Sequence, residues 1–285
     1  MPELPEVEVF KQFIDRHALG KPIRDVQVLQ PKILEGVTPK EFVRAMAGHQ
    51  FSTTLRRGKH VFVQIQPLTA KPSTSALPWM FLHFGMSGYL SYQSQGKTIV
   101  NAYGDPKLKH GHIRIQFDFE DGSHLAFHEQ RMFGKAGLIA DPQAYIEAKK
   151  IGPDAFEIDQ ATFLNRLKVR KGAIKPALMD QSMVAGVGNV YADEILYQCG
   201  IHPEARIADL SQKQLGNVFK QMVEVLQNTV AAGADRDRLP SNYMLHVRHP
   251  KGKCPRDQSS FEIKQVGGRT TYFCPVCQAL GNDSP

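Results

Sequence analysis

The spacing of apolar residues changes along the chain, and this change limits the possible folds more than any other feature. Between about residues 24 and 140, short stretches such as Val61–Ile65 place apolar residues at every second position, which is the period of a strand. From about 142 to 232, apolar residues instead recur every three to four positions, as in Leu215–Leu226, which is typical of helices. Strands followed by helices predict an α+β protein, in which a sandwich or barrel precedes a helical domain.

The chain also divides into parts by composition. The Asp141-Pro142 and Gly152-Pro153 pairs interrupt the pattern between its two halves, and such residues mark turns and linkers. The last forty or so residues change again, to a short module rich in Lys, Arg, Gly and Cys. In chain order, we expect a domain at 1–140, a linker at 141–156, a helical domain at 157–245 and a β-hairpin module at 246–285.

Composition restricts the class of protein. The 285 residues carry a net charge of +7, and this basic balance favours polyanionic partners such as nucleic acid. No stretch of eighteen apolar residues occurs, so we expect no membrane partner, and the acidic start is not a secretory signal. Four cysteines are too few for a disulfide scaffold of this length, and three of them lie between residues 254 and 277. This pattern indicates a metal site in a reducing compartment.

The first chemical motif is the start, Met1-Pro2-Glu3-Leu4-Pro5-Glu6. One interpretation is a helix start, since Pro suits the first turn of a helix. The other is catalytic: once Met1 is removed, Pro2 carries a secondary amine that is partly unprotonated at neutral pH. Such an amine can attack the C1′ carbon of a deoxyribose and form an iminium. Glu3 beside it can then transfer protons, and Glu6 follows one helical turn later on the same side.

Two further segments have the composition of phosphate-binding sites. The segment Arg56-Arg57-Gly58-Lys59-His60 precedes a strand, and it is either a solvated turn or a place where Lys59 meets a phosphate. The stretch Ala173–Glu194 contains Lys175 and then Gly186-Val187-Gly188-Asn189, where a second helix is expected to begin. Backbone N–H groups at a helix start, together with an Asn amide, form a phosphate cradle. The alternative is an ordinary turn between helices.

The cysteine pattern near the C-terminus is close to that of a zinc site. Cys254-Pro-Arg-Asp257 is followed by Cys274-Pro-Val-Cys277, so that Asp257 stands where a second Cys-x-x-Cys pair would have its other cysteine. A carboxylate is an accepted zinc ligand, and the alternative is a metal-free hairpin held by aromatic residues. Between the two arms, Gly267-Gly268-Arg269 predicts a hairpin tip whose Arg can reach a nucleic-acid phosphate.

Together and in this order, these motifs resemble the formamidopyrimidine-DNA glycosylase/endonuclease VIII family of base-excision repair enzymes. The start MPELPEVE is more similar to the formamidopyrimidine (8-oxoguanine) branch, and MDQSMVAGVGNVYADEILYQCGIHP is similar to the family's helix–two-turn–helix motif. The resemblance covers almost the whole chain. It implies an N-terminal helix on a β-sandwich, a helical domain with the two-turn motif and a zinc β-hairpin, with DNA bound between the domains.

The resemblance also assigns roles by motif position. It implies that Pro2 is the nucleophile, Glu3 the proton-transfer carboxylate and Lys59 a holder of the DNA backbone. Glu6, on the same side of the helix as Glu3, is a further catalytic candidate. The DNA-binding candidates are a phosphate-binding pair, a lysine of the same motif and three side chains that fill the gap left by an extruded base: Asn189 and Arg269, then Lys175, then Met86, Arg131 and Phe133. Ordinary core packing is the alternative for Met86 and Phe133.

Three positions depart from the family pattern. Asp257 replaces a cysteine ligand, so the expected Zn²⁺ site consists of Cys254, Asp257, Cys274 and Cys277. Met132 stands where the formamidopyrimidine branch usually has a second Arg, which implies one phosphate contact fewer. The segment Gly233–Tyr243 is shorter than the loop that covers the damaged base in that branch.

The expected function is that of a bifunctional DNA glycosylase and abasic-site lyase. It would remove 8-oxoguanine, formamidopyrimidines or oxidised pyrimidines and cleave the strand by β- or β/δ-elimination. The expected partner is damaged double-stranded DNA, met by a monomer in the cytoplasm at the bacterial nucleoid. The alternative is a damaged-DNA-binding protein of the same fold without catalysis. The sequence leaves open the preferred lesion, the opposite base and the extent of elimination.

Overall fold

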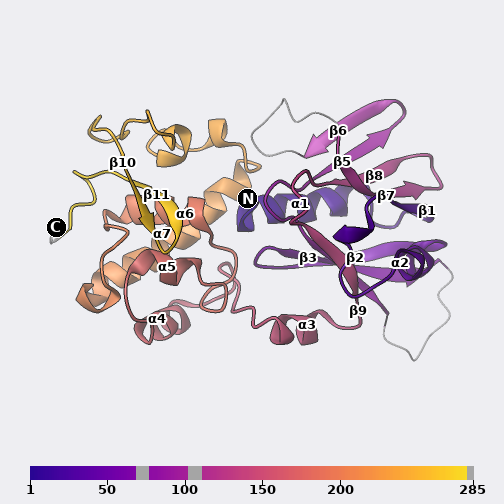
Figure 1. Cartoon of the computed structure of the whole chain (residues 1–285), viewed down its shortest axis with the longest axis horizontal. Coiled ribbons are helices and arrows are strands. Elements are labelled where there is room, and N and C mark those ends of the chain that lie inside the picture. The colour runs from indigo at the N-terminus through magenta and orange to yellow at the C-terminus, as the bar shows by residue number, and fades with distance from the viewer. Residues whose placement is uncertain (69–76, 102–110, 281–285) are drawn as a thin grey trace. The chain divides into compact units, whose positions relative to one another are not determined.

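The computed structural model describes residues 1–68, 77–101 and 111–280. The chain forms two compact units, Met1–Lys149 and Lys150–Pro285. Figure 1 shows that the first unit contains the two larger sheets and the second most of the helices together with the β10–β11 pair. The predicted order, strands before helices in an α+β protein, is confirmed.

The first unit is built mainly of antiparallel strands. Its elements in chain order are α1 (Leu4–His17), β1 (Ile23–Val28), η1 (Pro31–Ile33), α2 (Pro39–Met46), β2 (His49–Arg57), β3 (His60–Pro67), β4 (Trp79–His83), β5 (Tyr89–Ser94), β6 (Lys97–Asn101), β7 (Ile113–Phe119), β8 (His124–His128), β9 (Lys135–Ile139) and α3 (Pro142–Ala148). The strands form a five-stranded sheet in the order β1-β7-β8-β5-β6 and a four-stranded sheet in the order β2-β3-β4-β9.

One apolar core joins the two sheets. It contains buried side chains from both, and the rings of Phe51 on β2 and Phe117 on β7 meet edge to face with their centroids 5.4 Å apart. Each fully buried ring of this size contributes roughly 1.5–3 kcal/mol. The Asp121-Gly122 pair turns β7 into β8, and Asp121 Oδ1 accepts a hydrogen bond from the Ser123 N–H at 2.9 Å. The predicted hairpin and sandwich are therefore confirmed.

Helix α1 packs against both sheets. Val7, Phe10 and Ile14 are fully buried, and the helix contacts β2 and β3 of one sheet and β5 and β6 of the other. Pro5 lies in the first turn, where a backbone N–H would have no partner within the helix, so the N–H that proline lacks costs no hydrogen bond. The predicted N-terminal helix is confirmed, and its start is fixed by the core of the sandwich.

The second unit is mainly helical. Its elements are α4 (Gln160–Lys168), α5 (Ile174–Met179), α6 (Asn189–Cys199), η2 (Ile207–Asp209), α7 (Gln212–Ala231), η3 (Arg236–Arg238), η4 (Met244–Val247), β10 (Glu262–Val266) and β11 (Arg269–Phe273). Helix α6 is its centre, because it contacts α5, α7, η4 and β11 and residues 191–197 are all buried. Strands β10 and β11 form the predicted hairpin, with Gly267 and Gly268 at its turn.

Two helices lie where the sequence patterns indicated strands or a linker. Helix α2 interrupts the strand-rich half, and Thr38 caps it by accepting the Glu41 N–H while Glu41 accepts the Thr38 N–H. This reciprocal pair of hydrogen bonds is a known signal for the start of a helix. The sequence Thr38-Pro39-Lys40-Glu41 therefore carries the signal for helix α2. Helix α3 lies within the expected linker and begins after Asp141, whose carboxylate accepts two backbone N–H groups.

Candidate active site and nucleic-acid interface

The N-terminal motif lies at the start of helix α1. Glu3 precedes the helix, and its backbone N–H donates to Glu6 Oε2 at 2.8 Å. Both carboxylates are almost completely buried. Pro2 is also buried, with Met1 attached and 45% exposed. The ring nitrogen of Pro2 is bonded to the Met1 carbonyl, so it becomes an amine only when Met1 is removed.

Helix α1 is tied to the turn that carries Lys59. Arg56 Nε donates to Glu8 Oε2 of α1 at 2.6 Å, and Arg56 Nη1 donates to the Gly58 carbonyl at 3.2 Å. Thr54 of β2 adds a hydrogen bond to Asp15, near the other end of α1. A single arginine therefore links the helix that begins after Pro2 and Glu3 to the β2–β3 turn. The basic segment 56–60 is thus more than a solvated turn, because Arg56 faces a carboxylate.

Lys59 is a buried cation beside two histidines. Its side chain is only 8% exposed, and its charge acts on two histidines. Burial lowers the pKa of His83, and the positive charge of Lys59 lowers it further. Burial lowers the pKa of His60 to about 3, with smaller contributions from His83, Lys149 and Lys59. Both imidazoles are therefore neutral near pH 7, and the positive charge here belongs to lysine.

The three residues expected to fill the space that an extruded base leaves in DNA lie in two neighbouring loops of the first unit. Met86 is 37% exposed and Phe133 is 55% exposed, so neither is an ordinary core residue. Arg131 is exposed as well, with its guanidinium carbon 5.4 Å from the centre of the Phe133 ring. The neighbouring Met132 has a positive φ of 59° and packs against the sandwich core. Its side chain is thereby directed away from the exposed pair.

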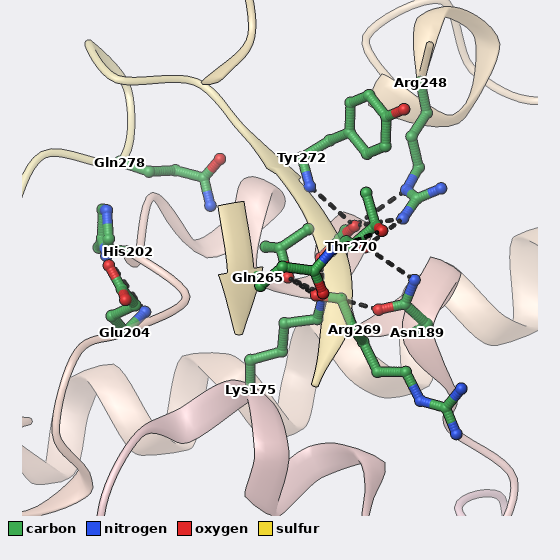
Figure 2. A network of polar contacts seen from close by, with 12 residues as sticks. Lys175, Asn189, His202, Glu204, Arg248, Gln265, Arg269, Thr270, Tyr272 and Gln278 are labelled. Carbon is green, nitrogen blue, oxygen red and sulfur yellow. Dashed lines mark hydrogen bonds and ion pairs between the residues drawn. The ribbon is translucent and has the colours of Figure 1, made fainter. Parts of the chain in front are cut away.

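In the second unit, the side-chain amide of Asn189 is held at both ends (Figure 2). Its Oδ1 accepts from Lys175 Nζ at 2.7 Å, and its Nδ2 donates to the Thr270 carbonyl of β11 at 2.9 Å. An amide nitrogen has two hydrogens, so the second remains available. Arg269 lies next to this contact, and its guanidinium points away from the network. Within the described part of the chain Arg269 has no acidic partner.

Lys175, expected to bind DNA, is completely buried. Its Nζ lies 2.6 Å from Asp193 Oδ1, as an ion pair whose alignment is not that of a hydrogen bond, and it donates to Thr271 Oγ1 at 2.5 Å. Asp193 Oδ2 accepts two hydrogen bonds from Arg248, at 2.6 and 2.9 Å. The ammonium group thus faces the inside of the unit, where it orients Asn189 and β11.

The loop between α5 and α6 is closed by one side chain. Gln181 Nε2 donates to the carbonyls of Met179 and Val187, and its Oε1 accepts the Gly186 N–H. The first helix ends at Met179, and the second begins at Asn189, as expected. The Gly186 N–H is already bonded, which leaves the Asn189 amide as the better-placed donor.

The four proposed metal ligands lie together. One ligand atom from each of Cys254, Asp257, Cys274 and Cys277 falls within 4.8 Å of all the others. The Cys254 and Cys277 sulfurs are 3.7 Å apart, close to the roughly 3.8 Å separation that tetrahedral zinc–sulfur bonds require. Both Cys274 and Cys277 donate to Asp257 Oδ2, at 3.1 and 3.0 Å. The donor set therefore fits a tetrahedral zinc ion.

Hydrogen bonds to the cluster alter its pKa values. Burial opposes the change, but hydrogen bonds from Cys277 and Ser259 lower the pKa of Asp257 below its usual range. Burial and the hydrogen bond to Asp257 raise the pKa of Cys277. Tyr197 Oη lies 3.2 Å from Cys254 Sγ, which connects the cluster to helix α6.

Two family models match the chain. The formamidopyrimidine-DNA glycosylase N-terminal domain matches residues 1–136, and the formamidopyrimidine-DNA glycosylase H2TH domain matches residues 151–240. The chain belongs to the formamidopyrimidine-DNA glycosylase family. The two matches coincide with the sandwich and with the helices that contain the two-turn motif, so the predicted family and branch are confirmed.

Relatives span the whole chain. Formamidopyrimidine-DNA glycosylases of Arabidopsis thaliana and Acaryochloris marina are both 32% identical to it; the first match covers 100% of this chain and 73% of the relative, the second 98% and 99%. Among solved structures, Lactococcus lactis Fpg with DNA containing N7-benzyl-Fapy-dG is 28% identical with a TM-score of 0.81, covering 98% of this chain and 100% of the other. Lactococcus lactis Fpg bound non-covalently to DNA with an AP site gives the same TM-score at 27% identity.

The sequence alone did not indicate the roles of several residues that the structure brings to these sites. Arg248 and Asp193 lie far apart in sequence, and Glu129 directly follows strand β8 in the polar stretch His128–Arg131. Their contacts depend on tertiary packing. The segment Gly233–Tyr243 contains only the short helix η3. No described helix of this family member is long and apolar enough to pass through a membrane.

Proposed function

We propose that this protein excises oxidised bases from duplex DNA and cleaves the strand at the resulting abasic site, with Pro2 as the nucleophile. The observation that carries the proposal is the start of helix α1. There the backbone of Glu3, next to Pro2, is held by Glu6, and helix α1 is linked through Glu8 and Arg56 to the β2–β3 turn that carries Lys59. The family relationship supports the same reaction class, a bifunctional glycosylase and abasic-site lyase in base-excision repair.

The chemistry follows from a secondary amine. After Met1 is removed, the Pro2 nitrogen forms a bond to C1′ as the C1′–base bond breaks, and the proton that the nitrogen loses is taken up by the departing base. Opening of the C1′–O4′ bond gives an iminium, and Glu3 delivers a proton to O4′. The cationic iminium acidifies the C2′ hydrogen, so loss of that proton expels the 3′ phosphate by β-elimination. A second elimination at the 5′ side gives the β/δ outcome, and water finally releases Pro2.

The surrounding residues have positioning and charge roles in this scheme. Glu6 holds the backbone of Glu3 through the hydrogen bond to its N–H. Lys59 supplies a positive charge for a phosphate next to the target sugar, because the adjacent histidines are neutral. Met86, Arg131 and Phe133 fill the space of the everted base, and their exposure supports this role. Unstacking a base costs a few kcal/mol, roughly, which such wedges partly restore.

The second unit contributes phosphate binding. The remaining Asn189 amide hydrogen and the exposed Arg269 guanidinium are donors for DNA phosphates. The contacts of Lys175 support a different role from direct DNA binding, namely holding Asn189 and β11 in place. Cys254, Asp257, Cys274 and Cys277 would hold a zinc ion, which when bound supplies only a structural cross-link. This cross-link would fix the hairpin that presents Arg269.

The proposal includes the setting of the reaction. The enzyme acts as a monomer on damaged double-stranded DNA, which in a bacterial cell lies at the nucleoid in the cytoplasm. Its substrates are oxidised bases, and 8-oxoguanine, formamidopyrimidines and oxidised pyrimidines form the panel to compare.

Borohydride trapping tests the covalent step. The native protein is expected to form a stable adduct with an oxidised-base duplex, and Pro2→Gly is expected to lose it. Pro5→Ala is the matched control, because Pro5 lies in the same helix start but has no nucleophilic nitrogen. The mass of the mature protein should correspond to loss of Met1. Equal trapping by Pro2→Gly, or a retained Met1, would exclude this mechanism, and tight binding to abasic DNA without nicking would support a non-catalytic damage-binding protein.

A further inference from the structure

Two crossings between the sheets lie side by side at one end of the sandwich. The chain passes from β4 to β5 through residues 84–88 and returns from β8 to β9 through residues 129–134. Strand β4 pairs with β9, and β5 pairs with β8, so the two connecting loops must be neighbours. The first loop carries Met86 and the second carries Arg131 and Phe133.

The two loops touch through their backbones. A Cβ atom at Gly85 would lie 2.4 Å from the Gly134 nitrogen and 2.5 Å from the Phe133 carbonyl carbon. Only glycine fits at such distances, so Gly85 allows the close approach of the two loops. A displacement of the backbone at Phe133 and Gly134 would therefore act directly on the loop that carries Met86.

A single carboxylate lies between these loops. Glu129 is completely buried; its Oε1 accepts the Ser87 hydroxyl at 2.6 Å and its Oε2 accepts the Phe133 N–H at 3.0 Å. One oxygen thus holds the residue after Met86, and the other holds the backbone of Phe133. A buried carboxylate needs such donors, since burying it without them is costly.

We infer that Glu129 is a positioning residue that sets the two wedge-carrying loops as one unit. This role rests on the proposed function, because it acts through Met86, Arg131 and Phe133 and not through the sugar. It predicts that Glu129 matters for everting a stacked base and matters little once the base is gone.

The test compares two DNA substrates under single-turnover conditions. Glu129→Leu removes both acceptors and is expected to slow excision from an oxidised-base duplex roughly ten-fold or more. Cleavage of a duplex with a preformed abasic site should stay within a factor of roughly two. A 2-aminopurine next to the lesion should show a smaller fluorescence rise with this variant, because the neighbouring base remains stacked.

Two milder variants separate positioning from general stability. Glu129→Gln keeps the shape, since its oxygen can accept the Phe133 N–H while its amide donates to the Ser87 hydroxyl, and it should restore excision. Ser87→Ala should show a smaller loss of the same kind, with no further loss when it is combined with Glu129→Leu. Asp118→Asn is the control, because Asp118 is also a buried carboxylate, on β7, and lies in neither loop.

The outcomes decide between the alternatives. Three results would each overturn the inference. The first is an equal loss of rate on both substrates with Glu129→Leu, and the second is additive effects of Ser87→Ala and Glu129→Leu. The third is an Asp118→Asn variant that also slows base excision while leaving abasic-site cleavage unchanged. If Glu129→Leu does not fold, Ser87→Ala and Glu129→Gln still provide the comparison. A native protein that releases no base and cuts no abasic site would instead overturn the proposed function, and the 2-aminopurine signal would then decide on Glu129.

Discussion

Removal of the Asp193 carboxylate is expected to destabilise the second unit strongly. Asp193 is fully buried between Lys175, itself fully buried, and Arg248. In Asp193→Leu the Lys175 ammonium remains buried without its counter-charge. Breaking a buried pair in this way costs about 3–5 kcal/mol. The Tyr272 N–H, which donates to Asp193 Oδ2 at 3.2 Å, also loses its acceptor.

The double variant Lys175→Met with Asp193→Leu provides the comparison. It removes both charges, so the cost of an unpaired ammonium disappears, and replacing a whole buried pair by apolar residues is often nearly neutral. Arg248 remains, but it is 12% exposed and can turn to solvent. We therefore expect the double variant to recover at least about 2 kcal/mol relative to Asp193→Leu.

Urea unfolding followed by far-ultraviolet circular dichroism measures the effect. With a slope of about 2 kcal/mol per molar urea, Asp193→Leu should lower the midpoint by roughly 1.5–2.5 M. The only tryptophan, Trp79, lies on β4 of the first unit, so its fluorescence monitors the sandwich. A double variant as unstable as Asp193→Leu would refute the reasoning, because the loss would then arise from packing and not from a stranded charge.

Two further predictions concern other buried or ligand carboxylates. Burial raises the pKa of Glu194 to about 7 from 4.5, so between these pH values the folded state keeps a proton that the unfolded chain releases. The free energy of unfolding should therefore fall by about 3 kcal/mol as the pH rises from about 4.5 to about 7. Glu194→Gln should flatten that dependence in urea titrations between about pH 5 and pH 8, and an unchanged slope would contradict the assignment. Asp257→Cys should retain roughly one zinc per chain for longer against a chelator, because thiolate suits zinc well; equal rates of zinc loss, measured by metal analysis, would argue against Asp257 as a ligand.

Features set by local sequence could be predicted well. The Asp121-Gly122 turn and the Gly267-Gly268 turn depend on backbone conformations that few residue types adopt. Helix α1 depends on a three-to-four spacing with Pro5 in its first turn. The ligand cluster follows from the spacing of Cys254–Asp257 and Cys274–Cys277. In each case the residues that decide the structure are close in sequence.

Strand order could not be obtained in this way. Strand β1 pairs with β7, so that Val26 lies opposite Phe117, and no local pattern connects segments so far apart. Met132 is a second example. Its positive φ and its packing on the core depend on the neighbouring loop, whereas its sequence position suggested only a missing arginine.

Buried charges explain the main difference between the sequence interpretation and the structure. Lys175 lies in a phosphate-binding motif, and a lysine is normally exposed, so direct DNA contact was the natural expectation. A charge can be buried only where partners surround it, and those partners, Asp193 and Thr271, come from other elements. Glu129 follows the same rule with Ser87 and the Phe133 backbone. In both places the buried group positions a residue proposed to touch DNA: Lys175 bonds the side chain of Asn189, and Glu129 bonds the backbone of Phe133. Substitution of the buried group should therefore impair DNA recognition without removing any atom that contacts DNA.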